Sequence, residues 1–355
     1  MPSHRSSPRA AGRAARQQSP AYEYLPVFTD GKLPSCIADR YNWSNHPGLA
    51  ADASSAGDQH TMSGQDDLAS PSPGRQRPRS SPARVAAGVA LGLLLGYLSV
   101  VGLSMLLEER LVFFPSRYPE GDWKPLDLHP EDADFAAADG VRLHGWYLPR
   151  QQPLAAVLFC HGNAGNITHR YELLWMLHHR VGVSMLIFDY RGYGRSEGSP
   201  TEAGILADAR AARAWLAARE GIAESQIVLM GESLGGAVAV DLAAADGARA
   251  LVLQKTFTSL PDVAAHHFPW LPVRWLMRNR LDSLGKIANY RGPLLMCHGQ
   301  PDTIVPYELG RRLFEAANEP KQWIDLPGDD HNDPLPPSYF EQLKRFLESL
   351  PPVEQ

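Results

Sequence analysis

Residues 227–236 read IVLMGESLGG, an apolar run that leads into the pattern G-x-S-x-G around Ser233. The apolar run is typical of a buried strand, and the small residues after Leu234 are typical of a helix packed closely on a sheet. A serine on the sharp turn between such a strand and helix is exposed for nucleophilic attack. Glycines are needed on either side of it, where the strand and the helix crowd together. The stretch therefore predicts an α/β sheet that carries a nucleophilic serine.

The chain alternates between strand and helix on both sides of this turn. A hairpin is expected over residues 135–147, with its turn at Asp139-Gly140, and Thr201 is placed to cap an amphipathic helix. This alternation predicts a mostly parallel central sheet with helices on both faces, in a folded domain of residues 134–352. Buried strands are expected at residues 155–160, 183–189, 227–230, 250–254, 293–297 and 322–326.

A serine needs a general base to become a good nucleophile, and that base needs an acid to fix its tautomer. Asp302 and His331 each follow a predicted strand, so both are expected at the carboxyl-end edge of the sheet, together with Ser233. We therefore predict a catalytic triad of Ser233, Asp302 and His331. Asp329 and Asp330 are alternatives for the acid, but immediate neighbours of a histidine rarely reach the far nitrogen of its ring.

The oxyanion that develops during acyl transfer needs two fixed hydrogen-bond donors, which are usually backbone N–H groups. Residues 159–166, FCHGNAGN, follow a predicted strand and lead into a helix. The amide of Asn163 in this turn is expected to act together with the amide of Leu234, the residue after the nucleophile. The two amides form the predicted oxyanion hole.

The composition argues against several other classes of protein. With 34 basic and 39 acidic residues among 355, the net charge is −5, so no basic field attracts nucleic acid and no nucleic-acid partner is expected. Three scattered cysteines without a CxxC pair indicate neither a disulfide framework nor a zinc site. No metal and no organic cofactor is expected, because the predicted triad needs none.

Residues 85–107 contain no charge, and a helix of that length covers ~34 Å. This run predicts a transmembrane helix, and it lies too far from Met1 to be a signal peptide. The Ser- and Pro-rich residues 1–83 are expected to be a disordered tail, and residues 108–133 a connector to the folded domain.

Two further properties of the span follow from its flanks and its glycines. Arginines are slightly more frequent before it than after it, which favours a non-cytoplasmic catalytic domain by the positive-inside rule. Gly88, Gly92 and Gly96 share one helix face. Either they let a second copy approach to form a homodimer, or they reflect the ordinary glycine content of membrane helices.

Three motifs carry a resemblance to a known family: LVFFPS at 111–116, FCHGNAGN at 159–166 and DYRGYGRS at 189–196. With the G-x-S-x-G turn, they make the chain resemble the α/β-hydrolase superfamily over about residues 125–350, and within it the serine-aminopeptidase-like hydrolase domain. With the membrane span, the chain is similar to the membrane-anchored group that includes protein depalmitoylases.

This resemblance implies the α/β-hydrolase fold and an esterase or thioesterase activity. It also implies the same triad and oxyanion residues as the spacing does. In this fold a lid commonly stands where residues 257–288 lie, and their aromatic side chains either contact an acyl chain or pack on the sheet. Within this segment, His266 and His267 have no evident partner and are expected to be solvated.

The function expected from the sequence is that of a membrane-anchored serine hydrolase. Its substrates would be acyl esters or thioesters, cleaved through an acyl-enzyme intermediate. Two alternatives stay open: a serine aminopeptidase-type peptidase with the same triad, and a non-catalytic scaffold that keeps the fold for protein interaction.

Overall fold

The computed structural model describes residues 81–352. The tail predicted to be disordered lies outside the described residues, except that Pro82 and Ala83 already belong to the first described helix. This helix, α2 (Pro82–Leu106), coincides closely with the predicted membrane span and is long and apolar enough to cross a membrane, with a mean hydropathy of 2.2. A short helix, α3 (Glu108–Val112), follows it.

An eight-stranded sheet in the order β10-β9-β8-β7-β4-β6-β3-β2 forms the centre of the domain. Only β2 and β3 run antiparallel to their neighbours, as expected for the predicted hairpin, and the other neighbouring strands pair in parallel. The strands are β2 (Glu131–Ala136), β3 (Arg142–Leu148), β4 (Ala156–Cys160), β6 (Ser184–Phe188), β7 (Val228–Glu232), β8 (Ala250–Gln254), β9 (Leu294–Gly299) and β10 (Lys321–Leu326).

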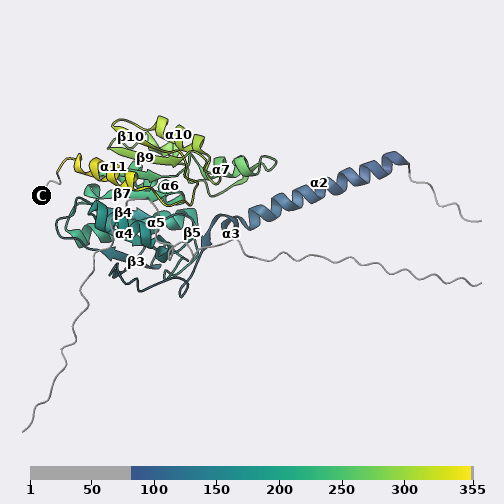
Figure 1. Cartoon of the computed structure of the whole chain (residues 1–355). Coiled ribbons are helices and arrows are strands. Elements are labelled where there is room, and N and C mark those ends of the chain that lie inside the picture. Colours follow the sequence, from purple (N-terminus) through teal and green to yellow (C-terminus); the bar gives the residue numbers. More distant parts are fainter. Residues whose placement is uncertain (1–80, 353–355) are drawn as a thin grey trace, which may run out of the picture. The chain divides into compact units, whose positions relative to one another are not determined.

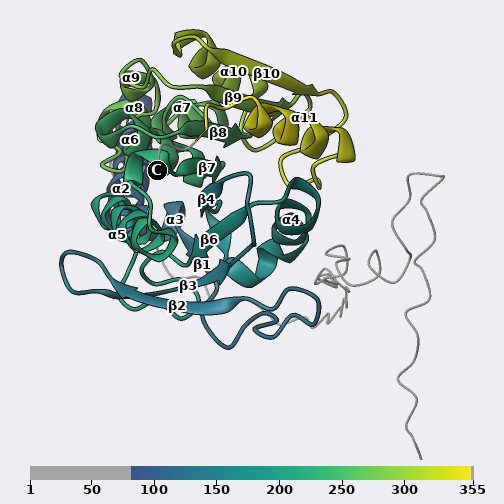
Figure 2. The same ribbon diagram turned by 90° about the vertical axis from the view of Figure 1, so that its left-hand side faces the viewer.

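Helices cover both faces of this sheet (Figures 1 and 2). One apolar cluster packs α5 (Glu202–Glu220), α6 (Leu234–Asp246) and α10 (Tyr307–Ala316) on one face. A second cluster packs α4 (Tyr171–Met176) and α11 (Pro337–Glu348) on the other. The sequence prediction of a mostly parallel, doubly covered sheet is confirmed.

Local signals in the sequence explain several helix ends. The Thr201 hydroxyl accepts a hydrogen bond from the Gly204 amide at 3.1 Å, which caps α5 as predicted.

Short elements complete the fold: η1 (Ile167–Arg170), η2 (Leu177–Val181), η3 (Glu224–Gln226), α7 (Leu260–His267), α8 (Val273–Leu276) and α9 (Leu284–Ile287).

The segment predicted to be a lid joins β8 to β9 and divides into two environments. Phe257, Leu281 and Ile287 are buried in the core below α6, so its two ends belong to the body of the domain. Phe268 and Trp270, which follow α7, and Trp275 within α8 are exposed.

Candidate active site

The nucleophile turn joins β7 to α6 and places Ser233 in a strained backbone conformation, with φ of 52° and ψ of −117°. The Ser233 amide donates to the Gln254 carbonyl at 2.9 Å, which holds the turn against β8. The flanking glycines are required by space: a Cβ on Gly231 would lie 2.2 Å from the Gly235 carbonyl oxygen, and one on Gly235 only 2.0 Å from the Cys160 carbonyl oxygen. Strand β7 and helix α6 can therefore approach closely enough to present the serine at the sheet edge.

His331 bridges the other two residues of the predicted triad. Its Nε2 lies 3.0 Å from the Ser233 Oγ, and its Nδ1 lies 2.8 Å from the Asp302 Oδ2. Because the carboxylate can only accept, Nδ1 carries the proton and Nε2 is free to accept one from the serine. The three residues follow β7, β9 and β10, so the sheet brings together residues that lie up to 98 positions apart in the chain.

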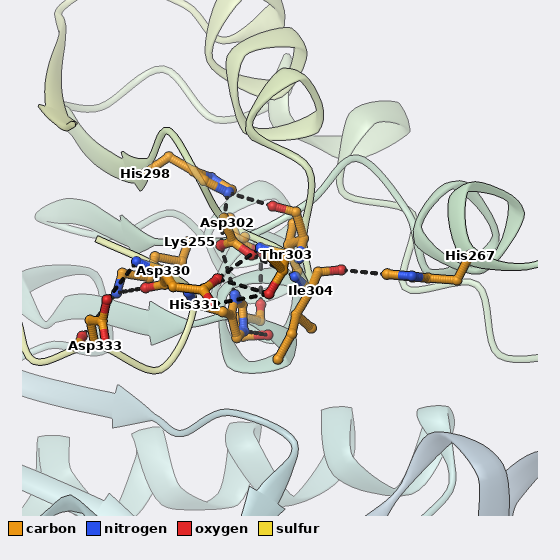
Figure 3. Close-up of polar contacts among 12 residues, drawn as sticks. Lys255, His267, His298, Asp302, Thr303, Ile304, Asp330, His331 and Asp333 are labelled. Carbon is orange, nitrogen blue, oxygen red and sulfur yellow. Dashed lines mark hydrogen bonds and ion pairs between the residues drawn. The ribbon is translucent and has the colours of Figure 1, made fainter. Parts of the chain in front are cut away.

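The surroundings of Asp302 keep it ionised (Figure 3). Its Oδ1 accepts from the amides of Ile304 at 3.0 Å and Val305 at 2.7 Å, and its Oδ2 lies 3.2 Å from the His298 Nε2. Burial alone would raise the pKa of Asp302, but the hydrogen bonds from His298 and His331 hold it well below its usual range. The carboxylate is thus a permanent negative partner for His331.

Asp330, one of the two alternative acids, makes different contacts. Its Oδ1 accepts from the backbone amides of Thr303 at 2.8 Å and of His331 at 2.7 Å. It therefore ties the loop that carries Asp302 to the loop that carries His331, as Figure 3 shows, while its own carboxylate stays off the imidazole ring.

Lys255 is hydrogen-bonded to the loop that carries His331. Its Nζ donates to the carbonyls of Asp330 at 2.7 Å and Asp333 at 2.9 Å (Figure 3). Lys255 is buried and has a φ of 46°, a left-handed conformation that is uncommon outside glycine. Lys255 thus has both an uncommon backbone conformation and a side chain hydrogen-bonded to the loop that carries His331.

The structure places the two predicted oxyanion residues at neighbouring strand ends. Leu234 is the first residue of α6, directly after β7, and Asn163 lies in the turn after β4, which pairs with β7 up to Cys160 and Gly231. The Tyr193 hydroxyl donates to the Asn163 carbonyl at 2.8 Å and so fixes this turn. Both backbone amides therefore belong to loops that end at the same edge of the sheet as Ser233.

Comparison with known proteins shows to which family this architecture belongs. A family model described as the alpha/beta hydrolase fold matches residues 155–283. WAV2 of Arabidopsis thaliana, an alpha/beta hydrolase domain-containing protein, is 32% identical over 291 residues, which cover 73% of this chain and 94% of that protein. The chain is a member of the α/β-hydrolase family.

Other relatives extend this result. An uncharacterized protein of Mycobacterium tuberculosis is 45% identical over 229 residues, which cover 64% of this chain and 81% of that protein. Among solved structures, the esterase Pf2001 of Pyrococcus furiosus has a TM-score of 0.54 at 21% identity, covering 67% of this chain and 98% of that one. The similarity to Pf2001 shows that the two proteins share the α/β-hydrolase fold.

The segment before the hydrolase domain is more than a connector, because it is hydrogen-bonded to the oxyanion turn. Its strand β1 (Phe114–Pro115) pairs in parallel with β5 (Ala164–Gly165), and the Ser116 amide donates to the Gly165 carbonyl at 3.0 Å. The Asn163 side-chain amide donates to the Val112 carbonyl at the end of α3. The chain that leaves α2 therefore helps to fix one of the two candidate oxyanion donors of this α/β hydrolase.

We expect Asn163→Ala to lower kcat for an acyl ester about tenfold with little change in KM, because the backbone donor remains but its turn is no longer held by Val112. Steady-state kinetics of the solubilised full chain measure this. A matched control is Asn318→Ala, since Asn318 also donates to two backbone carbonyls, those of Ala288 and Tyr290, but precedes β10 at the other end of the sheet. Equal effects of the two substitutions would contradict the assignment.

Three contacts around the site were not expected from the sequence. His298 begins the stretch HGQPD, but nothing in the spacing shows that its ring reaches Asp302. Lys255 and the β1 pairing depend on tertiary placement alone. His266 and His267 are both exposed, as expected. His267, for which the sequence shows no partner, nevertheless lies with its Nε2 2.8 Å from the Ile304 carbonyl (Figure 3).

Three further buried groups near the sheet edge are held in their neutral forms. Burial raises the pKa of the Cys160 and Cys297 thiols to about 12, which keeps both protonated and unreactive. Burial lowers the pKa of His161 to about 3, so this neighbour of the oxyanion turn stays neutral. Among residues 81–352, no cluster of three metal-ligating side chains is present.

Proposed function

We propose that this protein is a membrane-anchored serine hydrolase that cleaves acyl esters or thioesters through an acyl-enzyme intermediate. The observation that carries the proposal is the continuous hydrogen-bonded array Ser233–His331–Asp302, with distances of 3.0 Å and 2.8 Å. A structural serine or a satisfied core histidine has no need of this arrangement at the end of a strained turn.

In the first step the Ser233 Oγ attacks the acyl carbonyl carbon, and its proton passes to the Nε2 of His331. The carbonyl oxygen becomes an oxyanion and accepts hydrogen bonds from the amides of Asn163 and Leu234. Collapse of this intermediate breaks the bond to the leaving alcohol or thiol, which takes the proton from His331. An ester of Ser233 with the acyl group remains.

Water then releases the acyl group by the same route. His331 removes a proton from the water, the resulting hydroxide attacks the acyl carbonyl, and the proton returns to the Ser233 Oγ as the carboxylic acid leaves. Throughout both steps Asp302 stays ionised and stabilises the imidazolium that forms on His331.

The membrane part of the proposal rests on α2. Its 25 residues include an uncharged run that covers a hydrocarbon core of about 30 Å. We place the catalytic domain on the non-cytoplasmic side, in line with the arginines before the span. Within the structure nothing lies within 4 Å of a Cβ placed on Gly88, Gly92 or Gly96, so this face is open to a second copy in a homodimer.

A substrate panel tests the proposed chemistry. We expect the solubilised chain to hydrolyse p-nitrophenyl esters with a preferred acyl length, and to accept the matching acyl thioester, while alanine p-nitroanilide is left intact. Cleavage of the anilide in preference to every ester would favour the aminopeptidase alternative. Absence of turnover on the whole panel by a folded chain would favour the non-catalytic scaffold.

A further inference from the structure

The most exposed apolar side chains of the hydrolase domain gather at the tip of its lid, which we define as residues 268–275. Phe268, Trp270 and Trp275 are 50%, 56% and 86% exposed. Exposure of large apolar side chains to water is unfavourable. Tryptophan is enriched at the membrane–water interface. We therefore expect the lid tip to contact an apolar surface.

The position of this partner follows from contacts with α2. The Tyr97 hydroxyl donates to the Trp270 carbonyl at 3.1 Å, and the two rings lie 6.4 Å apart. Eleven residues further along, Glu108 is buried and accepts from the Asn279 amide at 2.7 Å and the Asn279 Nδ2 at 2.8 Å. The lid is thus tied to α2 through Tyr97 and to the start of α3 through Glu108.

Tyr97 lies well inside the span. Within the uncharged run, residues 85–96 precede Tyr97. They cover about 18 Å of helix, which is less than the thickness of a hydrocarbon core, about 30 Å. If α2 spans, the apolar layer must extend past Tyr97 toward Glu108. Trp270 lies against Tyr97 and therefore lies within that layer.

The backbone of the lid tip suits such a place. Pro269 and Pro272 have no N–H group, and the amides of Phe268, Leu271 and Trp275 donate to carbonyls within residues 264–272. Few backbone donors are left to be satisfied by water, which is the condition for non-helical chain in an apolar layer.

Arginines lie next to the lid tip. Residues 263–281 contain three arginines and no acidic residue. Arg274 pairs with Asp262, and Arg278 pairs with Glu108 and Glu109 at the start of α3, directly after the span. An aromatic tip with an arginine-rich base is the pattern of a segment that lies in a membrane interface.

We propose that the lid tip is inserted into the bilayer that α2 crosses, so that the active site draws its acyl substrate from the membrane. The inference rests on the proposed membrane anchoring. The base of the lid adjoins the triad, since His267 lies 2.8 Å from the Ile304 carbonyl and the Ile304 amide donates to Asp302 at 3.0 Å. A bilayer-resident acyl ester thus reaches the catalytic loops along the lid.

Site-specific fluorescence tests the insertion. Trp275→Cys is labelled with the fluorophore NBD in a full chain that carries Cys36→Ser, because Cys160 and Cys297 are buried. In vesicles of phosphatidylcholine and phosphatidylglycerol, the emission is expected to shift to the blue and to be quenched by doxyl-labelled lipids. Leu94→Cys in the middle of α2 reports the span, and Glu341→Cys on α11, which lies away from α7 in Figure 1, reports water.

The three probes separate the two claims. Quenching of the probes at 275 and 94 but not at 341 supports the proposal. Quenching at 94 alone leaves α2 as a span and overturns lid insertion. If neither 94 nor 275 is quenched, both the anchoring and the lid insertion are wrong, while activity on a water-soluble ester still reports the triad separately.

Kinetics give an independent readout. The double substitution Phe268→Ser, Trp275→Ser is expected to lower kcat/KM about tenfold for a long-chain ester presented in vesicles, and to leave a water-soluble butyrate ester unchanged. Leu126→Ser, which removes an equally exposed apolar side chain (85%) from the connector, is the control. An equal loss on the soluble ester would show that the tip acts on the triad and would contradict the proposal.

Discussion

Ser233→Ala is expected to lower kcat for a p-nitrophenyl ester by about 10⁵-fold, with little change in KM. The substitution removes the atom that forms the acyl-enzyme, while the oxyanion donors and the substrate contacts remain. Steady-state kinetics of the solubilised full chain measure the loss.

The matched control is Ser349→Ala. Ser349 also forms a hydrogen bond, to the Phe346 carbonyl at 2.7 Å, but it lies at the end of α11 and away from the triad. We expect the control to keep full activity. If Ser233→Ala retained more than a small fraction of wild-type kcat, another nucleophile would carry the reaction.

The second large effect is expected from Asp302→Asn, which should lower kcat by about 10³- to 10⁴-fold. An amide in this place no longer holds His331 with its proton on Nδ1, so Nε2 cannot act as the base. Burial alone would raise the pKa of Asp302, but the hydrogen bonds from His298 and His331 keep it well below its usual range. Protonation of Asp302 therefore makes no contribution to the fall in activity on mild acidification.

Asp330→Asn tests whether Asp302 or Asp330 is the acid that acts on His331. Asp330 ties Thr303 to the histidine loop, and an amide oxygen still accepts those two backbone hydrogen bonds. We expect a loss of no more than about tenfold. A greater loss for Asp330→Asn than for Asp302→Asn would reverse the assignment of the acid.

The fold was predictable because its signals are local. Each buried parallel strand is a short continuous apolar run, and the glycines around Ser233 are demanded by one strand-to-helix turn. The same local logic brought the three residues of the proposed triad together, since each lies in the segment after a strand and parallel strands end at one edge of the sheet.

The supporting contacts were not predictable because they join segments with no local signature. The Lys255 ammonium reaches carbonyls some 75 residues later in the chain, and the Asn163 side chain reaches a carbonyl 51 residues earlier. A lysine or an asparagine in a loop is usually solvated, so its spacing alone predicts no such contact. Only the packed structure shows that the segment after α2 pairs with the oxyanion turn.

In the lid, the sequence did not predict which apolar side chains are buried and which are exposed. The lid sequence contains large aromatic and aliphatic side chains, which fit both core packing and ligand contact. The structure separates the two, because Phe257 is buried and Trp275 is exposed. Periodicity gives no way to tell these environments apart in a segment made of short helices.

Covalent labelling tests whether Ser233 is the nucleophile. The solubilised full chain is treated with a fluorophosphonate probe, and the modified peptide is identified by mass spectrometry. We expect one adduct on Ser233, lost in Ser233→Ala and strongly slowed in His331→Ala. An unlabelled but folded chain, or an adduct on a different residue, would contradict it.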